Sequence, residues 1–384
     1  MASHKCSNIY HTSLPYLLFF CKNNEKVWKI QLFFVFLHKN NHMNNSFVIP
    51  NRLNWIDWAK VIAISCVVFG HIPQVSGSFP QHYIVTFHMP LFFFISGYLT
   101  KKEYFNTNTI KKYWHTLIIP YLLYNIVFYP YWIVRHLSQS ENVVWFDFIK
   151  PLIGILTLQI PTPVSEPLNQ VTWFVAALLV MKIILAFCNH SKKRGILIFI
   201  LIIGVGLLYI INKKYVFTHS ITTDGLLKCL PFYLIGHLCK QHRLINESIT
   251  WHDWLICPIG FFTSIVIYFY GGRDFSDILT FGLCLWAVSI TAIAATLSLC
   301  KLFDKLTSPI IKNLSIGTIA IMGLHWMIIG TVNVALTKLL LIKGDIIYPP
   351  IIAFILTVVY EALLYPIIIL FKNKYQFMLG KRQN

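Results

Sequence analysis

The sequence predicts an all-α, polytopic membrane protein with about ten transmembrane helices. Of its 384 residues, 56% are hydrophobic and only 12% are charged, whereas soluble domains contain about 25% charged residues. Apolar stretches of about 20 residues recur along nearly the whole chain, and each is long enough to cross a hydrocarbon core of ~30 Å as a helix. These observations exclude a soluble globular fold.

The apolar stretches give the expected helices in chain order. They lie, to within a few residues, at 56–75, 81–100, 113–134, 171–188, 195–212, 225–241, 252–270, 278–300, 315–337 and 347–371. An even number of spans leaves both chain ends on the same side of the membrane.

The basic residues between these stretches predict which side that is. Alternate connectors, from 101–112 to the tail at 372–384, together hold 16 Lys and Arg residues, whereas the intervening connectors hold seven. Because Lys and Arg in short loops collect in the cytoplasm, both termini are expected there. The net charge of +18 is spread over these short clusters, without the basic stripe or motif of a nucleic-acid-binding protein. The expected partner is therefore the lipid bilayer and not nucleic acid.

Two segments fall outside the ten spans. The connector at 135–170 has an apolar part that is broken by Pro, so it is expected to be an interfacial or re-entrant segment. Residues 1–42 contain two apolar stretches too short for a signal peptide or a span. Met43 is accordingly expected to be the biological start, with 43–384 as one integral membrane domain. A disordered or interfacial tail at 1–42 is the alternative.

The first span, within "NWIDWAKVIAISCVVFGHIP" at 54–73, carries three ionisable residues along one face. Lys60 and His71 are eleven residues apart, which brings them within ~20° of the same side of a helix, and Asp57 falls on that side too. Asp57 and Lys60 lie near a span end, where they could be interfacial anchors. His71 lies ~16 Å deeper. Because ionisable residues inside a membrane are rare and usually functional, His71 is predicted to be functional, with a carbonyl-bonded structural histidine as the alternative.

The second span contains "FHMPLFFFISGYL" at 87–99. His88 comes shortly before Pro90, which frees a backbone carbonyl, and Ser96 and Gly97 allow close helix approach. His82 and His88 are ~240° apart on a helix, so they cannot share a metal on one face. The sequence also lacks a His-Glu-x-x-His pattern and a Cys-x-x-Cys pair among its nine cysteines. The sequence therefore predicts no metal site.

Three later positions are further candidates. His325 lies in the middle of the ninth span, either lining a site or as a satisfied interior histidine. Glu361 lies in the middle of the tenth span, where an ionised carboxylate is costly; it is expected to be protonated, paired with a histidine or lysine, or functional. Trp173, with Asn169 and Gln170, marks the outer end of the fourth span, as an aromatic anchor or a surface on which a sugar stacks.

These motifs resemble the acyltransferase-3 family of bacterial membrane acyltransferases, which O-acetylate cell-surface sugars, and within it the fucose 4-O-acetylase-like branch. The resemblance covers residues from about 50 to 370. It rests on "RLNWIDWAKVIAISCVVFGHI" and "FHMPLFFFISGYL", followed by the weaker motifs "TWFVAALLV", "LPFYLIGHLCK" and "LSIGTIAIMGLHW". It implies a ten-helix fold in the bacterial plasma membrane, a catalytic first-helix histidine, and a basic cytoplasmic face for an acyl donor, typically acetyl-CoA, with no tightly bound cofactor.

Carried onto this chain, the resemblance gives a set of expected site residues. The expected catalytic residues are His71, Lys60 and Asp57. The expected donor-binding residues are Arg52, Lys111, Lys112 and His115. The expected residues of the acceptor site or cavity are His88, Ser96, Trp173, His325 and Glu361. Many relatives carry Arg-x-x-Arg after the second span, where this chain has "KKYWHTLIIPY"; lysine meets phosphate as a point charge, without the bidentate fork of arginine.

The expected reaction is acyl transfer to a sugar hydroxyl. The imidazole of His71 would accept the hydroxyl proton during attack on the thioester, directly or through an acyl-enzyme. The alternative from another class is a transporter or flippase of a surface-polysaccharide precursor, because intramembrane His and Glu also suit proton coupling. Against it, the sequence shows no internal repeat of the kind that many transporters have.

Overall fold

The computed structural model describes residues 52–75, 78–139, 143–215, 220–271, 278–342, 344 and 346–381. All of them belong to one compact unit, Val48–Asn384. They form helices and short connections, and no named strand occurs among them. The predicted start at Met43 and the predicted extension at 1–42 lie outside the described residues.

The helices follow one another along the chain as the apolar stretches predict. They are α2 (Asn54–His71), α3 (Phe79–Leu99), α4 (Thr107–Tyr113), α5 (Ile119–Gln139), α6 (Trp145–Leu156), α7 (Trp173–Cys188), α8 (Arg194–Tyr215), α9 (Ile221–Gln241), α10 (Trp251–Gly271), α11 (Ile278–Leu302), α12 (Pro309–Ile316), α13 (Thr318–Leu339) and α14 (Pro350–Asn373). Three short turns complete them: a π-helix, η1 (Trp114–Ile118), and the 3₁₀-helices η2 (Gln170–Thr172) and η3 (Gln376–Leu379). Each of the ten predicted spans falls on helical structure.

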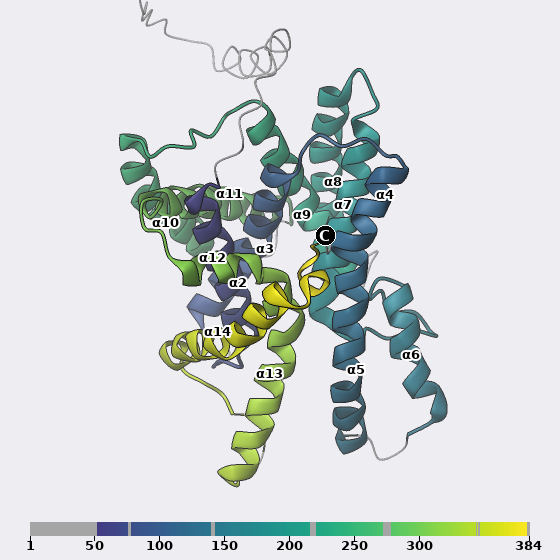
Figure 1. Ribbon diagram of the computed structural model, residues 1–384. Helices are drawn as coiled ribbons and strands as arrows, with labels where there is room; N and C mark the ends of the chain where they lie inside the picture. Colours follow the sequence, from purple (N-terminus) through teal and green to yellow (C-terminus); the bar gives the residue numbers. More distant parts are fainter. Residues whose placement is uncertain are drawn as a thin grey trace, which may run out of the picture. The chain divides into compact units, whose positions relative to one another are not determined.

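Seven segments among the described residues are long and apolar enough to cross a membrane. They are Thr107–Ser138, Gln170–Cys188, Arg194–Asn212, Trp251–Tyr270, Gly282–Leu302, Thr318–Leu339 and Pro350–Asn373. The multi-span helical class is thus confirmed, with seven candidate spans where about ten were predicted. The other three predicted spans, α2, α3 and α9, carry more polar residues, and α3 packs against both α2 and α9 (Figure 1). Their polar side chains therefore have protein neighbours.

The contact between α3 and α9 depends on two glycines. A Cβ at Gly97 would overlap the backbone carbonyl of Tyr233, and a Cβ at Gly236 would overlap that of Phe94. Small residues let the backbones of two membrane helices approach closely, so the close approach predicted at Gly97 is confirmed. Ser96 beside it bonds its own helix, with Oγ 2.9 Å from the carbonyl oxygen of Phe92.

We expect Gly97→Leu to destabilise the protein by ~2 kcal/mol or more, because overpacking against rigid backbone cannot relax by rotamer changes alone. Thermal denaturation in detergent, followed by size-exclusion chromatography, measures this as a lower midpoint. Gly204→Leu on α8 is the matched control, since a Cβ there meets nothing within 4 Å. Equal midpoints for the two variants would contradict the close packing of α3 on α9.

The connector between α5 and α7 contains irregular backbone buried within the protein. After α6, Leu158 and Gln159 adopt left-handed conformations, with φ of 56° and 63°, and the Gln159 side chain is fully buried. The Gln159 amide donates to the Gly154 carbonyl at 2.8 Å, and its side-chain oxygen accepts from the Leu168 amide at 2.8 Å. Non-helical backbone at membrane depth requires such internal partners; the interfacial or re-entrant position of this segment stays a prediction.

The C-terminal segment ties α14 to α5. It follows α14 as η3 (yellow in Figure 1), and the Tyr124 hydroxyl of α5 donates to the Met378 carbonyl at 2.8 Å. Gly380 has a left-handed φ of 66°, and a Cβ there would overlap the Thr116 carbonyl of η1. This turn places Lys381 beside η1.

Candidate active site

His71, the last residue of α2, meets His325 of α13. The two ring planes are inclined at 66° with centroids 4.9 Å apart, and Nε2 of His325 lies 3.3 Å from Nδ1 of His71. His325 is fully buried, whereas His71 is exposed. The structure therefore brings together two predicted site residues and leaves one of them accessible to a substrate.

Backbone carbonyls fix which ring nitrogens carry protons. Nδ1 of His325 lies 2.8 Å from the Ile321 oxygen, and Nδ1 of His71 lies 2.8 Å from the Val67 oxygen. A carbonyl oxygen only accepts hydrogen bonds, so both Nδ1 atoms are protonated and, in the neutral rings, both Nε2 atoms have a lone pair. The Nδ1–H group of His71 then donates a bifurcated hydrogen bond, to the Val67 oxygen and to Nε2 of His325. Nε2 of His71 bonds to none of the described residues and can act as a base.

His88 repeats this local geometry on α3. Its Nδ1 lies 2.8 Å from the Ile84 oxygen, and it lies close enough to His71 for electrostatic interaction between them. His88 is buried, with 6% of its surface exposed. Among the residues that the structure describes, no group of three or more His, Cys, Asp or Glu side chains could hold a metal ion.

A second polar group lies at the other end of α2, and we refer to Arg52, Asp57, Lys60 and Ser315 as the Arg52 cluster. The Arg52 guanidinium donates twice to Asp57, at 2.6 and 2.9 Å. The Ser315 hydroxyl donates to Asp57 at 2.5 Å, and the Lys60 ammonium donates to the Ser315 carbonyl at 2.8 Å. The short helix α12 thus binds both ionisable residues predicted near the start of the first span.

Further cations surround this cluster. The Lys372 ammonium of α14 donates to the Asn313 side chain at 2.9 Å. Burial, and then the positive charges of Arg52 and Lys372, lower the pKa of Lys381, which places Lys381 near both. Within the described residues, Asp57 is the only carboxylate that forms an ion pair with any of these cations or with Lys60. The excess positive charge suits an anionic ligand.

The three ionisable residues predicted to share one face of the first span therefore contact two different helices. Asp57 and Lys60 contact α12, whereas His71 contacts α13. Between them, the Ser65 hydroxyl donates to Glu361 of α14 at 2.6 Å. Glu361 is buried and its hydrogen-bond partner is a serine, so of the three predicted alternatives a protonated or a functional carboxyl stays a prediction.

The remaining predicted donor residues lie on α4 and η1. Lys112 pairs with Glu103, Lys111 is exposed, and His115 is half-buried beside Thr116. Lys381 follows Gly380, which packs on Thr116, so this lysine comes directly after a turn that lies against η1. Sequence reasoning used Lys381 only for topology, because nothing in a basic tail shows which side chain returns to the protein.

Trp173 is half-buried and packs against neighbouring helices. A Cβ at Gly225 of α9 would overlap its ring, and its ring centroid lies 6.0 Å from that of Phe93. The side chain of Asn169 is fully buried and donates to the Gly323 carbonyl, 3.1 Å away on α13. Trp173 thus has helix neighbours on α3 and α9.

This fold and this site define a multi-span helical membrane protein with a histidine pair between its helices. The acyltransferase domain model of the acyltransferase-3 family matches residues 53–367, and the chain therefore belongs to this family. The protein is accordingly an acyltransferase. No curated protein and no solved structure matches the chain.

Proposed function

We propose that the protein transfers an acetyl or other short acyl group from acyl-CoA to a hydroxyl of a cell-surface sugar or polysaccharide precursor, at the bacterial plasma membrane, as in the fucose 4-O-acetylase-like branch. The observation that supports this reaction best is the lone pair on Nε2 of His71: the side chain is exposed, and Nδ1 lies at hydrogen-bond distance from Val67 and His325. Acyl-CoA acts as a substrate and not as a resident cofactor.

In the proposed reaction, the acceptor hydroxyl attacks the thioester carbonyl carbon. Nε2 of His71 takes the hydroxyl proton while the new C–O bond forms, and the C–S bond then breaks. The coenzyme A thiolate leaves and receives the proton from His71. His325 holds the imidazole in the orientation and tautomer that this transfer requires, as an orienting carboxylate does in hydrolase triads.

The spacing along α2 suits the donor. Lys60 and His71 are eleven residues apart, or about 16 Å along a helix, and their contacts are with the consecutive helices α12 and α13. Coenzyme A carries its phosphates at one end of an extended pantetheine arm and its thioester at the other. We place the phosphates at the cations around the Arg52 cluster, including Lys372 and Lys381, with Lys112 and His115 beside them, and the thioester at His71.

We expect Lys372→Ala combined with Lys381→Ala to raise the KM for acetyl-CoA by about tenfold, the effect of losing roughly one charge-assisted hydrogen bond. The kcat should change little, because contacts to remote phosphates act alike in ground and transition states. Initial rates at varied acetyl-CoA measure both constants.

Lys374→Ala is the matched control, since Lys374 lies between the two lysines in sequence and is exposed. Lys111→Ala combined with Lys112→Ala tests the other predicted donor residues in the same assay. If only this second pair raises KM, the donor phosphates lie at α4 and not at the Arg52 cluster.

A further inference from the structure

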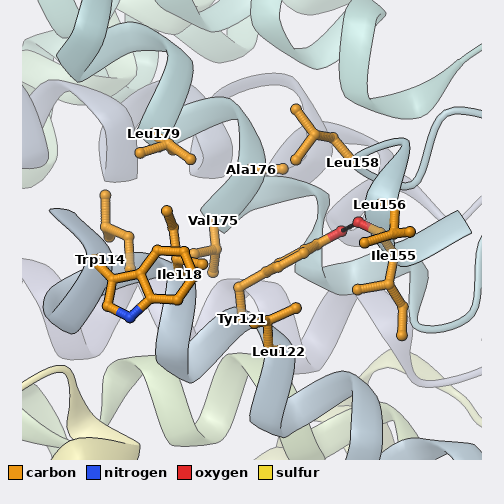
Figure 2. Close-up of a pocket in the computed structure, with 11 residues that line it drawn as sticks. Trp114, Ile118, Tyr121, Leu122, Ile155, Leu156, Leu158, Val175, Ala176 and Leu179 are labelled. Carbon is orange, nitrogen blue, oxygen red and sulfur yellow. Dashed lines mark hydrogen bonds between the residues drawn. The ribbon is translucent and has the colours of Figure 1, made fainter. Parts of the chain in front are cut away.

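An apolar cavity lies away from the histidine pair, between η1 and α5, the end of α6, and α7 (Figure 2). Its volume is about 240 Å³, and its lining includes Trp114, Tyr121, Ile155, Leu156 and Ala176. An engineered apolar cavity of ~150 Å³ binds benzene, so this space holds a larger group. Nothing in the acyl transfer derived above uses it.

The floor of this cavity is buried and its rim is exposed. Ala176, Tyr121 and Ile155 expose 2%, 5% and 7% of their surface, whereas Trp114 and Leu156 expose 50% and 78%. The cavity therefore opens sideways, between Trp114 and Leu156. Because Thr107–Ser138 and Gln170–Cys188 are candidate membrane spans, this opening faces the bilayer.

The buried floor of the cavity offers no unpaired side-chain donor to a ligand. The Tyr121 hydroxyl donates to the Ile155 carbonyl at 2.7 Å (Figure 2) and accepts from the Gln159 side chain at 3.2 Å. Its other lining side chains are apolar, apart from the indole of Trp114 at the exposed rim. Burying a polar ligand there without partners would be costly, so the occupant is hydrocarbon.

The shape of the cavity follows the helix. Its lining residues on η1 and α5 run from Trp114 to Leu122, which is about 12 Å of helix length. The first part of this stretch is the π-helix, and π-bulges in helices often mark functional sites. A cavity of this length along a membrane span fits part of one extended lipid chain.

A cation lies next to the exposed end of the cavity. Lys111 precedes Trp114 by one helical turn, so the two lie on neighbouring positions of the surface. Lys111 is exposed and pairs with none of the described residues, whereas Lys112 is paired with Glu103. Tryptophan and lysine are typical of the level of lipid headgroups.

We propose that this cavity binds one acyl chain of an anionic phospholipid, with the phosphate headgroup beside Lys111. The proposal is independent of the acyl-transfer reaction and assigns Lys111 to lipid and not to the acyl donor. Charge complementarity selects an anionic headgroup, and the chain is held by packing against the cavity walls, since lipid hydrocarbon itself is equally apolar.

The test uses the full-length protein in phosphatidylcholine vesicles that contain phosphatidylglycerol with a photoactivatable diazirine on one acyl chain. After irradiation, mass spectrometry should find the label on peptides that include 114–122, 155–158 and 175–179. Ala176→Leu and, as a second variant, Leu179→Phe fill the cavity and should lower this labelling at least about threefold, since packing holds the chain.

Controls of at least the same added bulk lie on α8, outside the cavity. Gly204 has open space around its Cβ position, and Ile203 is half-exposed, so Gly204→Leu and Ile203→Phe should keep full labelling of the cavity peptides. Unchanged labelling in both correctly folded filling variants would overturn the proposal. Because the readout is lipid labelling, it stands or fails separately from acyl transfer.

The headgroup is tested by changing the lipid and Lys111. Diazirine-labelled phosphatidylglycerol should label the cavity about fivefold more than labelled phosphatidylcholine, as expected for one interfacial charge contact, and Lys111→Gln should remove that preference. Equal labelling by both lipids in the wild-type protein, or stronger labelling by a diazirine-bearing prenyl phosphate, would overturn the assignment to an anionic phospholipid.

Discussion

His71→Ala is expected to lower acyl transfer by about 10²- to 10⁴-fold, the usual cost of removing a general base. The change removes the unprotonated Nε2 atom but no packing that the fold depends on, because His71 is exposed at the end of α2. Alanine also suits a membrane helix better than histidine does. Transfer from labelled acetyl-CoA in membranes, normalised to the amount of inserted protein, measures the effect.

Two other histidines of the chain serve as comparisons for this variant. His82 is exposed on α3, so His82→Ala should leave turnover unchanged. His88 is buried and bonded to the Ile84 carbonyl, so His88→Ala should lower the yield of protein more than the turnover of each molecule. Wild-type turnover from inserted His71→Ala protein would remove the catalytic role of His71.

The helices could be predicted from the sequence because membrane thickness imposes a length on every apolar stretch. The length and hydropathy of these stretches do not by themselves give the number of membrane spans. In α2, α3 and α9, residues such as Asp57, His88 and His237 lower the hydropathy, and these helices are polar where they contact other helices. The seven candidate spans therefore leave out α2 and α3, which carry His71, Lys60, Asp57 and His88.

Individual site residues were predictable, but their partners were not. His71 and His325 each stand out as an ionisable group in an apolar stretch, yet they are 254 residues apart in the chain and only the packing of α2 on α13 joins them. Ser65 and Ser315 carry no charge and gave no signal, although they bind Glu361 and Asp57. Partners of this kind depend on helix rotation, which a single apolar stretch does not fix.

The contact between His325 and His71 predicts a second large effect on catalysis, when His325 is replaced. We expect His325→Leu to lower kcat by about 10- to 100-fold, by analogy with the loss of the hydrogen-bond partner that orients a metal-ligating histidine. The physical reason is that the imidazole of His71 would keep only the Val67 carbonyl and could rotate about that single bond. Because His325 does not touch the donor in the proposed reaction, the KM for acetyl-CoA should stay unchanged.

His325→Gln separates positioning from simple packing. An amide oxygen at this position can accept the Nδ1 proton of His71, as Nε2 of His325 does at 3.3 Å, so the glutamine variant should recover most of the kcat lost with leucine. Both variants fill the fully buried site of His325, and a role in packing alone would give them similar rates. Steady-state kinetics of the two proteins in the same membranes decides: equal kcat values for leucine and glutamine would show that the hydrogen bond to His71 does not position the base.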